Sequence, residues 1–368
     1  MCLKSNGGLK MNSPLIIPFF IPHAGCPFTC VFCNQWEISG EKDEIKAEDI
    51  DKSVEEYLKR ARIWPGRQIE IAYFGGTFTA IPVDKQIALL EAAAEQKKKG
   101  CIKGIRLSTR PDCINEEILE RLLAYGVTTV ELGVQSLVDE VLEKTHRGHS
   151  VEDIVKATRL LRKYPFQVGY QLMLGLPGDT NASARLTGER AVELAPDIIR
   201  IYPTLVLKGT TLARWYAQGK YAPWTLERAV EIAANWLGLF SLHHIPVIRM
   251  GLNPTENISP ERDLLAGPYH SAFGELVENS LMLKQIVSAF EKEDFKKDSK
   301  ITILCNSRSC SKVIGQKKCN FEYIKEKYGV SKISIEFEDK LGKDDLVVCN
   351  TFESITVKRE DFLEKYRI

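Results

Sequence analysis

The chain has 368 residues, of which 44% are hydrophobic and 27% are charged. This composition supplies enough apolar material for a large core and excludes a disordered or fibrous protein. Fifty basic residues against 49 acidic ones leave a formal net charge of +1. The whole molecule therefore has no electrostatic bias toward nucleic acid or membrane, and any such bias must be local.

The longest apolar stretch near the start, residues 15–22, is too short to span a bilayer and is interrupted by proline. We therefore expect a cytoplasmic protein with no membrane partner. The chain has ten cysteines. Because cytosolic thiols are kept reduced, ten cysteines in such a protein indicate metal or redox chemistry rather than a disulfide framework.

Between residues 15 and 250, short apolar runs alternate with longer amphipathic segments, which is typical of βα units around a parallel sheet. The predicted strands are 15–21, 69–74, 104–109, 128–134, 167–174 and 197–202, with a possible seventh at 246–250. The predicted helices are 48–61, 84–98, 116–124, 151–163, 182–194 and 226–242. The pattern predicts an α/β fold, a partial β/α barrel of six units, with its chemistry in loops at the carboxyl ends of the strands.

The pattern changes after residue 250, and we expect three parts: a barrel domain over 1–252, a linking segment over 253–300 and a small α+β module over 301–368. In the module we predict a strand at 301–305, helices at 309–314 and 319–328, and a strand at 331–337.

The predicted module resembles KH modules, which clamp a nucleic-acid backbone with a GxxG turn between two helices. Here the turn is Gly315-Gln316-Lys317-Lys318, so a lysine replaces the second glycine. Residues 306–332 contain seven basic and two acidic residues. Phosphate contacts would use such an excess, although a solvated helix face explains it as well.

Three cysteines, Cys26, Cys30 and Cys33, follow the first predicted strand with the spacing CxxxCxxC. Thiolates so close in sequence can hold one metal centre, and their softness selects an iron–sulfur cluster or zinc. Structural zinc and electron-transfer clusters normally take four protein ligands. His23 could complete a zinc site, whereas three cysteines alone leave one iron open for an external chelating ligand.

With Phe32 just before the last cysteine, the motif resembles that of the radical S-adenosylmethionine superfamily. The resemblance implies a 4Fe-4S cluster on Cys26, Cys30 and Cys33, whose open iron is chelated by the methionine part of S-adenosyl-L-methionine. One electron then cleaves the sulfonium to a 5′-deoxyadenosyl radical, which abstracts hydrogen from a substrate. The resemblance also implies an external electron donor of the flavodoxin or ferredoxin type.

The second predicted strand ends in Gly75-Gly76-Thr77. Glycines at a strand end let the backbone approach a ligand closely, although a bare tight turn explains them about as well. The segment resembles the superfamily's GGE-type motif, whose backbone holds the methionine amino group. Thr77 stands where many members have glutamate, which puts any carboxylate role in doubt.

Other polar side chains follow the next strands. Ser108 and Gln135 are candidates for the ribose hydroxyls or the methionine carboxylate, and Arg147 is a candidate bidentate clamp on that carboxylate. Capping or solvation would account for any one of them taken singly. The edge 173–178 is apolar and glycine-rich, suited to packing an adenine. The sequence nominates no catalytic acid or base.

In order, segments 74–78, 108–112, 131–136, 147–149 and 202–206 resemble the radical domain of the Elongator catalytic subunit, and more loosely the oxygen-independent coproporphyrinogen oxidases. The resemblance implies modification of the wobble uridine of tRNA. In Elongator a fused domain delivers an acetyl group. About 118 residues follow Met250 here, with no recognisable acetyl-CoA loop, and the Elongator subunit spaces its first two cysteines more widely.

We therefore expect a radical enzyme that acts on tRNA or another RNA, with no DNA partner. One alternative is the same radical chemistry on a small molecule, such as a tetrapyrrole-like or metabolic substrate. Another is a non-catalytic iron–sulfur carrier or RNA-binding scaffold.

Overall fold

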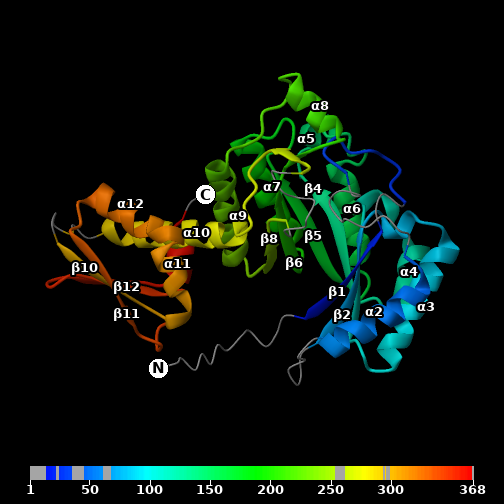
Figure 1. The fold of residues 1–368 in the computed structure, drawn as a ribbon, viewed down its shortest axis with the longest axis horizontal. Coiled ribbons are helices and arrows are strands. Elements are labelled where there is room, and N and C mark those ends of the chain that lie inside the picture. Colours follow the sequence, from blue (N-terminus) through cyan, green and yellow to red (C-terminus); the bar gives the residue numbers. More distant parts are fainter. Residues whose placement is uncertain are drawn as a thin grey trace.

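The computed structural model describes residues 14–21, 25–34, 45–60, 68–252, 262–292, 295 and 299–366. Its main body is a seven-stranded parallel sheet with the strand order β1-β2-β3-β4-β5-β6-β8, curled into a half barrel (Figure 1). The strands are β1 (Leu15–Ile21), β2 (Ile69–Gly75), β3 (Gly104–Thr109), β4 (Thr129–Gln135), β5 (Gln167–Leu174), β6 (Ile198–Pro203) and β8 (Val247–Met250). The predicted α/β partial barrel is confirmed, and the possible seventh strand is present.

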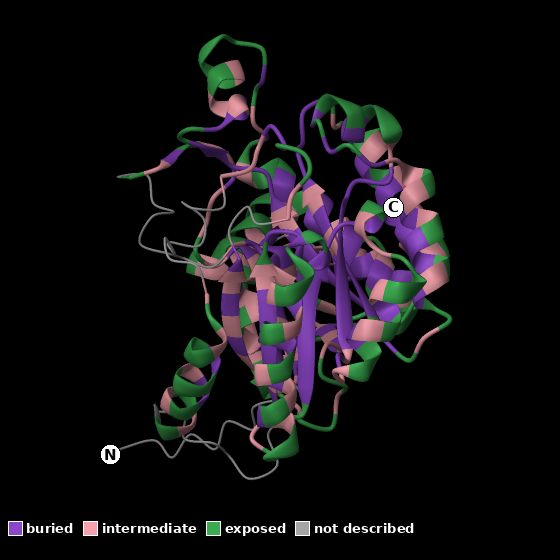
Figure 2. Cartoon of the chain, turned by 90° about the vertical axis from the view of Figure 1, so that its right-hand side faces the viewer, coloured by how far each residue is buried: buried purple, intermediate pink, exposed green. Residues whose placement is uncertain are grey.

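Helices follow the strands and cover the outer face of the sheet, with their own outer faces exposed (Figure 2). The main ones are α2 (Ala47–Arg60), α3 (Val83–Lys98), α4 (Glu116–Ala124), α6 (Val151–Leu161), α7 (Asn181–Leu194) and α9 (Leu226–Leu242). Their first turns explain where several begin, because Asn115, Ser150 and Thr180 accept backbone N–H groups at the starts of α4, α6 and α7.

Four short elements near the carboxyl ends of the strands were not predicted. They are α5 (Asp139–Lys144), α8 (Thr211–Ala217) and an antiparallel pair formed by β7 (Val206–Leu207) and β9 (Leu264–Ala266). Each is too short to show a helical or strand periodicity in sequence. Together they extend the edge of the barrel at which the strands end (Figure 1).

The strands β3, β4 and β6 are buried along almost their whole length, as expected for central strands of a parallel sheet that is covered on both faces. Ile17 of β1, Ile71 of β2 and Leu172 of β5 are fully buried. On the helix side of the sheet, the Tyr73 hydroxyl donates to the carbonyl of Leu89 in α3 at 2.6 Å. Burial raises the pKa of Tyr73, so the phenol stays protonated and holds α3 against the sheet.

The C-terminal module contains a four-stranded sheet with the order β11-β10-β12-β13. Its strands are β10 (Lys300–Cys305), β11 (Lys332–Phe337), β12 (Leu346–Cys349) and β13 (Ser354–Val357), and its helices are α11 (Cys310–Ile314), α12 (Cys319–Tyr328) and α13 (Arg359–Lys365). β10 pairs in parallel with β11 and antiparallel with β12. The elements predicted up to residue 337 are present, whereas β12, β13 and α13 were missed.

An unpredicted helix, α10 (Phe273–Phe290), joins the half barrel to the module (Figure 1). It packs against α9 on one side and against α11, α12 and β13 on the other. Its apolar residues are therefore buried around most of the helix, Val277, Met282 and Ile286 completely, and they form no single stripe that a sequence reading would detect. The division of the chain at residues 252 and 300 stays a prediction.

No helix in the described ranges combines the length and the apolar character that a bilayer crossing requires.

Candidate functional site

The cysteine loop, residues 25–34, lies across the carboxyl ends of the strands and is anchored by backbone bonds. Gly25 has φ +71°, and a Cβ at this position would lie 2.4 Å from the Thr77 carbonyl oxygen, so only glycine fits. Further along, the Val31 N–H donates to the Thr145 carbonyl at 3.1 Å, and the Val31 carbonyl accepts from the Leu212 N–H at 2.7 Å. Residues 22–24, including His23, lie outside the described residues.

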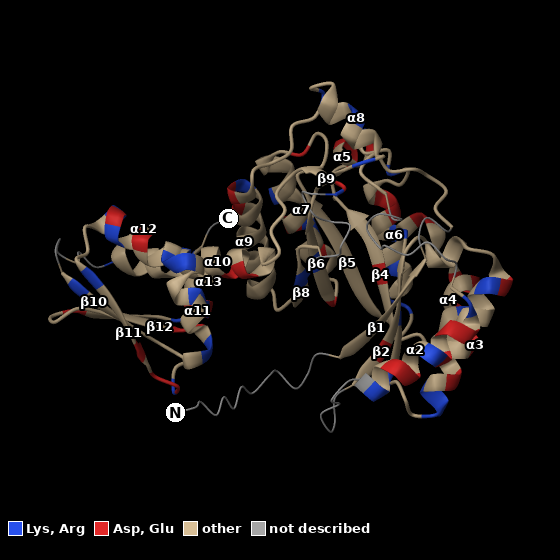
Figure 3. Ribbon diagram, viewed as in Figure 1, with Lys and Arg blue, Asp and Glu red and all other residues tan. Residues whose placement is uncertain are grey.

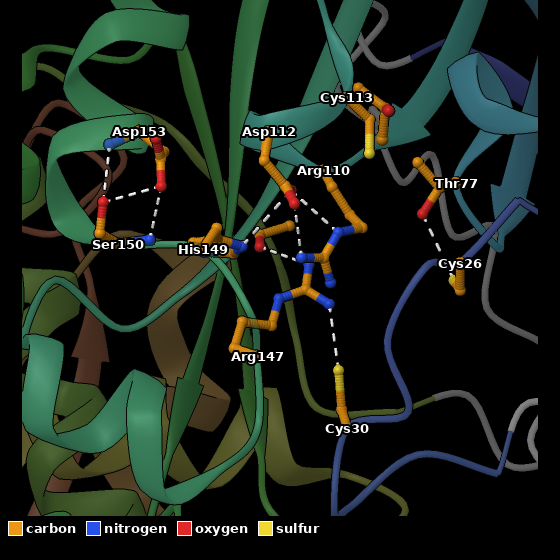
Figure 4. Close-up of polar contacts among 12 residues, drawn as sticks. Cys26, Cys30, Thr77, Arg110, Asp112, Cys113, Arg147, His149, Ser150 and Asp153 are labelled. Atoms are coloured by element: carbon orange, nitrogen blue, oxygen red, sulfur yellow. Dashed lines mark hydrogen bonds and ion pairs between the residues drawn. The ribbon is translucent and has the colours of Figure 1, made fainter.

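Two of the three cysteine thiols contact residues singled out in the sequence (Figure 4). The Cys26 sulfur lies 3.3 Å from the Thr77 hydroxyl, and the Arg147 Nη1 donates to the Cys30 sulfur at 3.3 Å. Cys30 is buried, whereas Cys26 and Cys33 are partly exposed. The Cys33 N–H donates to the Cys30 carbonyl at 3.1 Å, which keeps the last cysteine on the same turn.

The end of β2 packs directly beneath this loop. Gly75 has φ +101°, and a Cβ there would meet the backbone of Ile21 at 3.2 Å. The Gly76 N–H donates to the Ile21 carbonyl at 2.7 Å, so this donor is engaged by β1. Thr77 is buried and faces Cys26. The glycine pair therefore brings β2 close to the cysteine loop.

Arg147 connects the cysteine loop to β4. Besides Cys30, it donates through Nη2 to the Gly133 carbonyl at 2.7 Å, while its buried Nε has no hydrogen-bond partner among the described residues. Gln135, at the end of β4, has φ +65°, which is costly for a residue with a side chain, and its buried Oε1 is also without a partner in the described chain. Two predicted ligand residues thus carry unsatisfied polar atoms at the same strand end.

Ser108 occupies a different position, inside the barrel. Its hydroxyl accepts from Gln171 of β5 at 2.9 Å, and its register partner in β4 is Glu131. Ser108 therefore belongs to a buried polar network, and its role at the cosubstrate stays a prediction.

The centre of that network is Glu131, which lies in the segment 131–136 noted in the sequence but was given no individual role there. Its carboxylate accepts from Arg106 of β3 at 2.7 Å, from Arg200 of β6 at 3.0 Å and from Gln171 at 3.0 Å. Arg106 also donates to Glu70 of β2 at 2.8 Å. The network joins β2 to β6 across the barrel interior, and charged residues at inward positions of otherwise apolar strands were the available signal.

A second polar group lies beside Arg147, in the segments 108–112 and 147–149 noted in the sequence, although its residues were given no individual role there (Figure 4). Arg110 is 2% exposed and donates through Nε and Nη2 to Asp112 at 2.9 and 2.8 Å, but its Nη1 has no hydrogen-bond partner in the described ranges. His149 lies 3.9 Å from Asp112. Burial, followed by the charges of Arg147 and Arg110, lowers the pKa of His149 to about 3, so the imidazole is neutral at physiological pH.

The chemistry of this site fits an iron–sulfur cluster with a chelating cosubstrate. Cys26, Cys30 and Cys33 are soft donors on one short loop, although within the described ranges no three His, Cys, Asp or Glu side chains converge tightly enough to hold a metal ion. Arg147 beside Cys30 would stabilise a thiolate. Unsatisfied donors on Arg110 and Arg147, with an unsatisfied acceptor on Gln135, suit a ligand that carries both a carboxylate and hydroxyl or amino groups.

Comparisons with known proteins agree with this geometry. Residues 20–189 match the radical SAM superfamily model, and residues 196–282 match the radical SAM C-terminal domain model. The chain is 36% identical over 264 residues to the tRNA uridine(34) acetyltransferase of Methanocaldococcus jannaschii, covering 62% of this chain and 49% of that protein. It is 30% identical over 281 residues to Elongator complex protein 3 of Bos taurus, covering 64% and 50% respectively.

Among solved structures, an N-terminally truncated Elp3 from the archaeon Methanocaldococcus infernus matches with a TM-score of 0.55 and 25% identity, covering 77% of this chain and 63% of that one. The chain spans about half the length of the curated relatives it matches. The chain belongs to the radical S-adenosylmethionine superfamily, as a radical SAM enzyme with an Elongator-like radical domain. Enzymes of this superfamily use a 4Fe-4S cluster and S-adenosylmethionine.

The fit of Gly25 against β2 gives a first prediction. In Gly25→Ala, the added methyl group would overlap the Thr77 carbonyl, so we expect the loop to shift and the anaerobically reconstituted protein to lose most of its iron. Gly100→Ala is the matched control, because Gly100 has a similar φ of +76° but nothing within 4 Å, and it should cost about 1 kcal/mol of stability and no iron. Equal iron and sulfide contents in the two variants would contradict the argument.

The buried imidazole gives a second prediction. The pKa of His149 is about 3 in the folded protein against 6.5 in the unfolded chain, so below pH 6.5 only the unfolded chain takes up the proton. The free energy of unfolding should therefore fall as the pH drops from 6.5, by up to about 1.4 kcal/mol per pH unit from this group. Urea titrations at several pH values should show a shallower decline in His149→Gln than in the wild type. Identical pH dependence of the two proteins would be inconsistent with a neutral buried His149.

Proposed function

We propose that the protein reductively cleaves S-adenosylmethionine at a 4Fe-4S cluster on Cys26, Cys30 and Cys33 and modifies a tRNA by hydrogen abstraction. The observation that carries the proposal is the meeting of the cysteine loop with Arg147 and Gln135, whose unsatisfied polar atoms face the same strand edge. When bound, the cluster supplies the electron for cleavage of the sulfonium. An external donor of the flavodoxin or ferredoxin type would reduce it.

The chain's own residues would bind and orient the cosubstrate. Arg147 Nε and Arg110 Nη1 are buried cationic donors suited to a carboxylate, which they would hold by charge-assisted hydrogen bonds. Gln135 Oε1 can only accept a hydrogen bond, so it suits a hydroxyl or ammonium group. His149 lies near Arg147 and Arg110 and is neutral, so it adds no third positive charge to this buried region.

Two lines support tRNA as the substrate. The relatives matched over the radical domain are named for acetylation of tRNA uridine 34, although the whole activity of those longer proteins does not transfer to this chain. The C-terminal module adds Lys317 and Lys318, which are exposed in the turn between α11 and α12. Phosphate groups are the natural partners of such lysines.

The basic excess of the module is smaller than its sequence indicates. Lys312 is paired with Glu278 at 2.5 Å and with Asp344 at 3.3 Å, and Lys325 is paired with Glu322 at 2.9 Å. Basic and acidic segments are interspersed over the module (Figure 3). The turn at Lys317 and Lys318 is therefore the part of the module that we propose to contact RNA.

Cluster ligation is tested by Cys30→Ala. Anaerobic reduction in the presence of S-adenosylmethionine should release 5′-deoxyadenosine from the wild type, whereas the variant should lose both the cluster absorbance and this product. Cys349→Ala is the matched control, because Cys349 lies on β12 of the module, and it should retain both. A Cys30 variant that still cleaves the cosubstrate would refute the ligand assignment.

The RNA substrate is tested by salt-dependent binding of tRNA. Replacing Lys317 and Lys318 by alanine should weaken binding and reduce the slope of log K against log salt by about 1 for each phosphate that a lysine no longer neutralises. Lys98→Ala/Lys99→Ala is the control, because this exposed pair lies at the end of α3 in the barrel domain. Binding that is absent or insensitive to salt in the wild type would argue for a small-molecule substrate instead.

A further inference from the structure

A cavity of about 540 Å³ lies between α5 and α8, beside the cysteine loop. We call it the lysine–tryptophan pocket, and its side walls are Lys144, His146, Trp215, Lys220, Tyr221 and Trp224. Residues 176–179, at the end of the apolar edge that follows β5, form its floor. Its volume lies within the range of about 300–1,000 Å³ that small-ligand sites occupy.

Aromatic rings form much of the wall. Trp224 is buried, with the guanidinium of Arg228 4.2 Å from the centre of its ring, and the Tyr221 hydroxyl donates to the Gly175 carbonyl at 2.6 Å. These two side chains are fixed. Trp215 is partly exposed and meets the His146 ring edge-on, with 5.8 Å between ring centroids. Trp215 is therefore a ring held in place beside open space, which suits stacking of a planar ligand.

The pocket is positively charged. Lys144 and Lys220 are exposed, and their ammonium groups form no hydrogen bond or ion pair within the part of the chain that the structure describes. The carboxylate of Asp179 accepts from the N–H groups of Gly175 at 2.9 Å and Thr180 at 3.1 Å and from the Ser183 hydroxyl, so its own loop satisfies it. The two lysines therefore remain available to an anionic ligand.

The pocket lies next to the proposed cosubstrate site. His146 lines the pocket with φ +54°, while the next residue, Arg147, turns inward to Cys30. Residues 176–178 belong to the edge that the sequence suggested for packing an adenine, whereas Gly75, Gln135 and Arg147 do not line the pocket. An occupant would therefore lie next to the reacting groups, separated from them by the His146–Arg147 turn.

We infer that the lysine–tryptophan pocket binds one nucleotide of the RNA substrate, a neighbour of the nucleotide that is modified. Its base stacks on Trp215 and its phosphate lies between Lys144 and Lys220. A nucleotide carries both a planar base and a negatively charged phosphate, which match the Trp215 ring and the two lysines of the pocket. Proteins commonly bind single-stranded RNA by stacking its bases on aromatic residues within basic grooves. The inference rests on the proposed RNA substrate and adds where that RNA docks.

The test uses the reconstituted full-length protein and two probes, uridine 5′-monophosphate and an anticodon stem-loop RNA. Tryptophan fluorescence should be quenched by uridine monophosphate and less by uridine or inorganic phosphate alone. Trp215→Leu should weaken binding of the stem-loop about tenfold, within the usual range for loss of one stacked base. Lys144→Glu and Lys220→Glu should weaken it as well and lower its salt dependence.

Trp215 packs near the cysteine loop, so its replacement could disturb the fold as well as the pocket. Lys144 and Lys220 are exposed, so their variants should keep the fold and change only the charge of the pocket. Lys103→Glu, an exposed lysine just before β3 at the opposite end of the barrel, is the matched control and should bind as the wild type does. Release of 5′-deoxyadenosine without RNA should stay unchanged in Lys144→Glu and Lys220→Glu.

Wild-type binding of the stem-loop that all three pocket variants retain would overturn this inference alone. If the wild-type protein binds no RNA at all, the proposed substrate fails with it. Loss of RNA binding in the lysine variants, with cosubstrate cleavage intact, supports both.

Discussion

The common direction of the seven barrel strands is the constraint on which the rest of the site depends. Because the strands are parallel, their carboxyl ends all meet one edge, and loops distant in sequence converge there. The cysteine loop after β1, the glycines ending β2, Arg110 after β3 and Gln135 ending β4 meet in this way. The Val31–Thr145 and Arg147–Cys30 bonds then fix the loop to that edge.

Several polar groups of the site lack hydrogen-bond partners in the described chain, and hydrogen bonds from a bound ligand would lower their free energy. Gln135 has a backbone conformation that disfavours side chains, and Arg110 and Arg147 leave buried donors unpaired within the described chain. In a stable protein such atoms normally have partners. In the proposed function these unpaired atoms bind the cosubstrate, whereas the hydroxyls of Tyr73 and Tyr221 already have protein partners.

Inside the barrel, Glu131 is the centre of a buried polar network. A carboxylate held by two arginines and a glutamine is stable in a dry interior only because every oxygen is paired. The network links β2, β3, β4, β5 and β6 through side-chain hydrogen bonds, in addition to the backbone pairing of these strands. It also makes the barrel interior polar, and none of its residues lines the lysine–tryptophan pocket.

The sequence by itself determined the βα alternation and the seven barrel strands to within about two residues, because both follow from local periodicity. The short cysteine motif was enough to indicate the family. The sequence could not reveal α10, whose burial on two sides removes the amphipathic stripe, or the Glu131 network, which requires strands distant in sequence to be neighbours. The role of Ser108 at the cosubstrate stays a prediction, and in the structure its hydroxyl accepts a hydrogen bond from Gln171. Only the tertiary structure shows that Trp215 lies beside His146 and that some lysines of the module are paired with carboxylates. Contacts of this kind join segments distant in sequence, so packing decides them and local pattern does not.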